Sequence, residues 1–185
     1  MLGLDNYLEI ITKRLAPYYD IYRDQTVMGE KLDLMARFKM RNEKYFLLKQ
    51  IKLFAYENHE IVLVRGEEQV TADRVKQFCT YLKQAAGELV RPSDEHMSSV
   101  ITGVLVATSG VTPEGQRIIE DFSYSKNFRL LLQGWCEVRL VAVDLTDHNV
   151  YTNKAGRALQ EAYCIFQGKE AQGETYRASI GSTII

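Results

Sequence analysis

The residues best suited to do chemistry are an acid and a lysine that we expect on neighbouring strands of one sheet. Segments 31–40 and 44–56 alternate apolar and polar residues around a two-residue turn, a pattern that predicts an antiparallel hairpin. Counting back from the turn places Asp33 opposite Lys52, and strand alternation puts Gln50 on the same face. An aspartate there could hold Mg²⁺ or Mn²⁺, and the ammonium group could orient a water molecule or stabilise a phosphoryl charge.

This acid followed by Gln-x-Lys resembles the signature of the restriction-endonuclease-like, or PD-(D/E)XK, superfamily, and in particular its Mrr-type enzymes. The stretch GVLVATSGVTPEGQR (residues 103–117) looks like the strand and helix opening that follow the catalytic segment in Mrr-like domains. The resemblance covers roughly residues 31–122. It implies a restriction-endonuclease-like core, with Asp33, Gln50 and Lys52 as catalytic residues and Asp33 as the ligand of a Mg²⁺ or Mn²⁺ cofactor.

The same residues leave a non-catalytic interpretation open. Gln50 stands where the family usually supplies a second metal-binding acid, and a neutral amide is a poorer ligand for a hard cation. If the strands are instead matched to the family's three in order, the lysine strand becomes 60–65, which contains Glu60 but no Glu-x-Lys. In that case Asp33 and Lys52 would form an exposed cross-strand ion pair without a functional role.

Two other groups of residues could bind ligands. Glu57 and Glu60 flank an expected turn, and His59 could join them at a metal ion, although acids at turns are commonly just solvated. The segment Thr108-Ser109-Gly110 could present backbone amides to an anion before the next helix begins, because the first N–H groups of a helix have no partner within it. Ordinary turn chemistry is the alternative for this segment.

The elements that must position these residues can be read from hydrophobic spacing and from helix caps. Their order predicts an α/β fold of the mixed α+β kind, in which a three-strand antiparallel meander is followed by α-β-α-β units. We expect a single domain over residues 1–167, beginning with a helix, and a mobile tail over 168–185. The expected helices cover 5–16, 72–87, 113–122 and 153–166, and the strands 31–40, 44–56, 60–65, 99–110, parts of 129–145, and 150–153; residues 17–25 are given no role.

Charge and cysteine content narrow the class of protein. Lys plus Arg number 23 against 24 Asp plus Glu, so the net charge of -1 gives no global attraction to nucleic acid or to an anionic membrane. Cys79, Cys136 and Cys164 lie far apart, which favours buried thiols over a disulfide framework or a zinc site. No membrane-spanning run or secretory signal is evident, so we expect a cytoplasmic protein without a membrane partner.

Three hypotheses for function follow. The first is a nuclease-like domain without catalysis that binds nucleic acid or another protein. The second is a divalent-metal-dependent nuclease that hydrolyses DNA or RNA phosphodiesters through Asp33, Gln50 and Lys52. The third is an unrelated α/β protein with a structural or small-molecule-binding role. The oligomeric state is left open.

Overall fold

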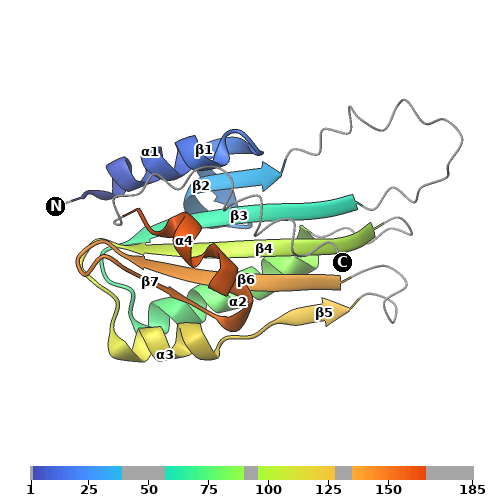
Figure 1. Ribbon diagram of the computed structural model, residues 1–185. Coiled ribbons are helices and arrows are strands. Elements are labelled where there is room, and N and C mark those ends of the chain that lie inside the picture. Colours follow the sequence, from blue (N-terminus) through green and yellow to red (C-terminus); the bar gives the residue numbers. More distant parts are fainter. Residues whose placement is uncertain (1, 39–56, 90–95, 128–134, 166–185) are drawn as a thin grey trace, which may run out of the picture.

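A mixed β-sheet with helices on both faces forms the protein (Figure 1), whose computed structural model describes residues 2–38, 57–89, 96–127 and 135–165. The seven-stranded sheet has the order β1-β2-β3-β4-β6-β5, and β7 pairs with β6 outside this path. The strands are β1 (Tyr19–Val27), β2 (Glu30–Phe38), β3 (Glu57–Glu67), β4 (His96–Ala107), β5 (Ser125–Asn127), β6 (Trp135–Asp144) and β7 (Asn149–Thr152). The helices are α1 (Leu4–Leu15), α2 (Ala72–Glu88), α3 (Pro113–Asp121), the 3-10 helix η2 (Lys154–Leu159) and α4 (Gln160–Tyr163).

The sheet confirms the mixed α/β class and the expected order of a meander followed by α-β-α-β units. β2 pairs antiparallel with β1 and with β3. β4 pairs parallel with β3 and with β6. The assignment of strands to the meander was wrong, however. Its first strand lies in the segment that was given no role, and β2 pairs with β1 on one side and with β3 on the other.

A tight turn explains why β1 was missed and why it pairs with β2. Met28 and Gly29 both have positive φ, 54° and 84°, and a two-residue turn of this kind matches the twist of an antiparallel hairpin. The turn holds the pairing from Val27↔Glu30 to Tyr19↔Phe38, which is interrupted only at Asp24, where φ is 51°. Met-Gly is a much weaker signal for such a turn than Asn-Gly, so the sequence pattern did not reveal it.

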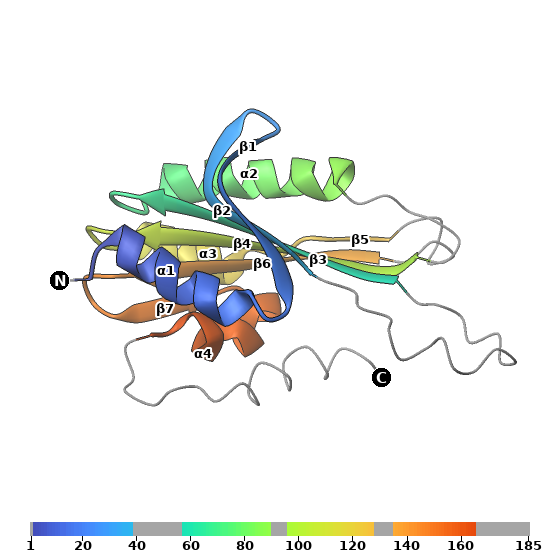
Figure 2. The ribbon, with the colours of Figure 1, turned by 90° about the horizontal axis from the view of Figure 1, so that it is seen from above.

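Each face of the central parallel strands is covered by its own helical layer. In Figure 2, α2 lies on one side of the sheet, whereas α1 and α4 lie on the other, over the carboxyl-terminal halves of the strands. β4 serves both layers, because Ile101 and Leu105 pack in the cluster that contains α2, and Val104 and Val106 pack in the cluster that contains α1. Such strands must be apolar on both faces, as the expected central strand is.

Threonine side chains cap the starts of α2 and α3. The hydroxyl oxygen of Thr71 accepts from the backbone N–H of Arg74 at the start of α2, and that of Thr112 accepts from Gly115 at the start of α3. At α1 the N-cap is Gly3, and Asp5 lies inside the first turn instead of capping it. An acid in that position is still favourable because the N-terminus of a helix carries partial positive charge.

Asn153 ties the last elements to the sheet. Its side-chain oxygen accepts from the backbone N–H groups of Leu140 and Gly156, and its amide nitrogen donates to the carbonyls of Phe122 and Val138. The residue is 1 % exposed. One buried amide therefore joins β6, η2 and the end of α3.

Among the described residues, no helix combines the length and the apolar character needed to cross a membrane. Cys79 and Cys136 are buried, as expected, and Cys164 is half-buried. Burial raises the pKa of the Cys79 thiol and of the Cys136 thiol to about 11 in each case.

Asn153→Ala should lower the free energy of unfolding by about 3 kcal/mol, because the buried groups bonded to the amide lose their partners. Urea denaturation followed by circular dichroism measures the loss. Asn6→Ala, at an exposed position of α1, is the matched control and should change stability by less than about 0.5 kcal/mol. An equally small effect at both positions would contradict the role given to Asn153.

A thiol-specific reagent at pH 8 should modify Cys164 well before Cys79 and Cys136. With a pKa of about 11, each of the two buried thiols is about 0.1% thiolate at that pH, and the thiolate is the reactive form. Mass spectrometry of peptides after timed labelling measures the order. Labelling of all three at one rate in the folded protein would show that the two thiols are not protected.

Candidate functional site

Asp33, the expected metal ligand, lies on β2 and contacts the end of β3. Its Oδ2 atom accepts a hydrogen bond of 2.6 Å from the backbone N–H of Gly66. On the other side of β2, the pairs Arg23↔Leu34 and Gln25↔Leu32 place Asp24 opposite Asp33. The carboxylate of Asp33 therefore has a structural partner, and one oxygen atom is occupied by the protein itself.

The basic side chain next to Gly66 also has partners within the protein. Nε of Arg65 lies 2.7 Å from Oε1 of Glu67, and Nη1 lies 3.2 Å from Oε2 of Glu30. The guanidinium group lies over the ring of Phe78 in α2, with Cζ 5.0 Å from the ring centroid. Arg65 thus fastens the end of β3 to β2 and to α2.

The expected placement of Asp33 opposite Lys52 is wrong, because both neighbours of β2 are already identified. They are β1 and β3, and neither contains Lys52. Gln50 and Lys52 themselves lie outside the described residues. The grouping of Asp33, Gln50 and Lys52 in one site stays a prediction.

A cleft of about 450 Å³ opens where β3 and β4 end and α2 begins. It is lined by Glu67, Glu68, Gln69, Thr71, Arg74 and Ser109. Glu67 contributes the least exposed carboxylate and lies 3.6 Å from the guanidinium of Arg74. The carboxyl ends of parallel strands are the usual place for ligands in α/β proteins, and here that edge is polar and of mixed charge.

The expected anion site at residues 108–110 is not supported. The backbone N–H of Thr108 donates to the carbonyl of Glu67, and that of Ser109 donates to the carbonyl of Glu68. The N–H of Val111, which follows, donates to Oδ2 of Asp144. These amides hold the strand ends together and are not directed toward a ligand, so ordinary turn chemistry describes the segment.

A second polar group lies inside the sheet, on the face covered by α1 and α4. The register aligns Val62, Thr102 and Arg139 across β3, β4 and β6, and one step earlier it aligns Glu60, Val100 and Glu137. Nη1 of Arg139 lies 3.9 Å from Oε1 of Glu60, and its Nε lies 3.9 Å from Oε2 of Glu137. Glu60, Thr102, Glu137 and Arg139 are called the charged row below.

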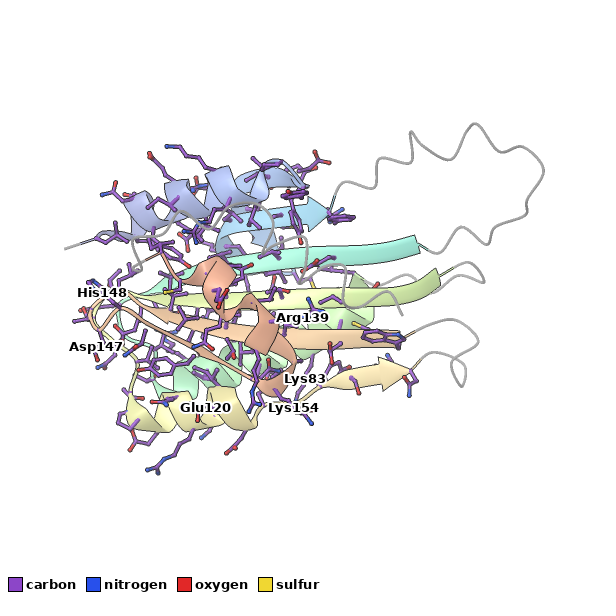
Figure 3. The ribbon with its side chains drawn as sticks, in the orientation of Figure 1. Lys83, Glu120, Arg139, Asp147, His148 and Lys154 are labelled. Atoms are coloured by element: carbon purple, nitrogen blue, oxygen red, sulfur yellow. The ribbon has the colours of Figure 1, made fainter. Side chains whose placement is uncertain are left out.

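The charged row departs from the rule that central parallel strands are apolar on both faces. Arg139 is 8 % exposed, and its buried Nε has no hydrogen-bond partner among the residues that the structure describes. Figure 3 shows Arg139 on the sheet, far from the β6–β7 turn that carries Asp147 and His148. A buried guanidinium that makes no hydrogen bond costs stability, and such costs are commonly found at functional sites.

Sequence reasoning placed Glu60 at the start of a strand, directly after a turn, and overlooked Arg139. Glu60 lies within β3, which continues through residues 57–67, so the expected turn at residues 58–59 is wrong. The sequence does contain a signal for the charged row. Glu137 and Arg139 place two charges on one face of a strand that is otherwise apolar. Over the described parts of the chain, no three His, Cys, Asp or Glu residues are grouped so that they could hold a metal ion.

Arg139→Met should lower the free energy of unfolding by about 3 kcal/mol, because Glu60 would keep a buried charge without its cation. Adding Glu60→Gln should recover most of that loss, since an amide is less costly to bury than a carboxylate. Guanidinium denaturation of the two single variants and the double variant gives the coupling. Additive losses would show that the two side chains do not interact.

Comparison with known proteins places this arrangement in a family. The search of curated proteins and the search of solved structures each find no match. The sequence pattern of one family, described as Domain of unknown function (DUF8052), matches residues 4–165, which include every described helix and strand. The chain therefore belongs to the DUF8052 family.

Proposed function

We propose that this protein is a non-catalytic protein-interaction module built on a restriction-endonuclease-like core. The observation that carries the proposal is the 2.6 Å hydrogen bond from the Gly66 N–H to Oδ2 of Asp33. The acid that the nuclease hypothesis requires as a metal ligand is used to hold β2 against the end of β3. The meander followed by α-β-α-β units supports a mixed α/β fold, and the restriction-endonuclease-like core is part of the proposal.

Charge supports a protein partner over a nucleic acid. Nucleic-acid binding depends mainly on cations that neutralise phosphates. Here Arg65 and Arg74 both contact Glu67, so these two guanidinium groups are already beside a carboxylate. A net charge of -1 adds no long-range attraction to phosphates.

Asp33→Ala should lower the free energy of unfolding by about 1 to 2 kcal/mol, because the partly buried N–H of Gly66 loses a charged acceptor. Thermal and urea denaturation measure this change. Removal of a catalytic acid commonly has the opposite effect and stabilises the protein. Asp73→Ala, at an exposed position of α2, controls for the loss of one negative charge.

The purified chain should neither cleave nor retard nucleic acid. Single- and double-stranded DNA and RNA are incubated with Mg²⁺ or Mn²⁺ for cleavage, and gel shifts are run at low salt, where phosphate contacts are strongest. Cleavage that depends on the metal ion and disappears in Asp33→Ala would establish the nuclease instead. A gel shift without cleavage would establish a nucleic-acid-binding module.

A further inference from the structure

The charged row contains a guanidinium group with a buried Nε atom that has no hydrogen-bond partner in the described part of the chain. An arginine has five N–H donors arranged to grip a carboxylate through two parallel hydrogen bonds. Among the described residues, Nε of Arg139 has no hydrogen-bond partner, and both carboxylate contacts of Arg139 are 3.9 Å long, about 1 Å beyond a charged hydrogen bond. This buried cation therefore lies near two carboxylates without forming a short hydrogen bond to either of them.

The two carboxylates differ in how firmly they are held. The side chain of Glu60 is 13% exposed, and its Oε1 lies 3.4 Å from the hydroxyl of the fully buried Thr102, which donates to it. The side chain of Glu137 is 32% exposed, and within the described part of the chain it has only the contact with Arg139. Glu60 is thus a fixed counter-ion, whereas Glu137 can turn into solvent at little cost.

We infer that Arg139 is the recognition residue for a carboxylate on a partner polypeptide, and that Glu137 occupies its place in the free protein. The inference rests on the proposed protein-interaction role and names the chemistry of the partner, an acidic side chain. When that carboxylate enters, Glu137 moves out, so the centre still holds one guanidinium and two carboxylates. The exchange therefore adds no net charge to the buried centre while replacing a 3.9 Å contact by charged hydrogen bonds.

The side-chain Nε–H signal of Arg139 in ¹⁵N-resolved NMR spectra reports directly on this step. The protein is titrated with a blocked peptide of four glutamates, with the matching peptide of four glutamines, and with acetate. We expect the glutamate peptide to shift the Arg139 signal and the glutamine peptide to leave it unchanged. An unchanged signal with the glutamate peptide overturns the inference.

Variants test the exchange itself. Glu137→Gln should increase affinity for the glutamate peptide by about fivefold, because the competing carboxylate is gone. Glu161→Gln, an exposed acid on α4, is the matched control and should leave affinity unchanged. Arg139→Gln should abolish binding, whereas Arg157→Gln, at an exposed position of η2, should not. Since Arg139→Gln could weaken folding, the Glu137→Gln result decides: unchanged or reduced affinity overturns the inference.

The remaining outcomes distinguish a carboxylate on a polypeptide from one on a small organic acid. They also distinguish failure of the carboxylate inference from failure of the proposed interaction module. Acetate that binds as tightly as the glutamate peptide would indicate a small organic acid and would overturn the assignment to a polypeptide. Metal-dependent cleavage of nucleic acid would refute the module proposal even if the peptide binds. No peptide binding together with no cleavage and no gel shift would overturn only the carboxylate inference.

Discussion

The parallel pairing of β3, β4 and β6 is the constraint on which the rest of the structure depends. Strands joined in this way need long crossovers, and the helices of those crossovers cover a face of the sheet. α2 and α3 fulfil this role on one face, so α1 and the η2–α4 segment must cover the other. β4 accordingly alternates large apolar residues toward both layers, and Gly103 leaves room for Leu82 and Phe78 of α2.

Parallel strands that are covered on both faces are expected to be apolar on both, and the charged row is the clearest exception in the described sheet. Buried ion pairs rarely stabilise a protein more than apolar residues of similar size would, because desolvation offsets the attraction between the charges. The pairing of Arg139 with Glu60 is also loose, so it does not repay its cost through good geometry. Arg65 also has buried nitrogen atoms without a hydrogen-bond partner in the described part of the chain, but its carboxylate contacts are shorter, at 3.2 Å to Glu30 and 2.7 Å to Glu67. The contact with Glu30 joins β3 to β2.

Local signals in the sequence were sufficient to predict where the helices lie, but not to predict which strands pair with one another. Thr71 and Thr112 mark the starts of α2 and α3 because a cap acts on residues two or three positions away. Strand pairing depends on residues far along the chain, and here β2 pairs with a segment whose turn, Met28-Gly29, carries a weak signal. The contact of Glu60 with Arg139 is likewise set by the strand order, which no local pattern specifies.

The left-handed backbone conformation of Asp24 affects edge-to-edge association between the sheets of two molecules. β1 is the outermost of the described strands, and a regular outer strand offers an open ladder of donors and acceptors to any other extended chain. At Asp24 the backbone has a positive φ of 51°, and the ladder with β2 is interrupted. A second sheet could align with only a few residues on either side of Asp24, so the irregularity disfavours edge-to-edge aggregation at high protein concentration.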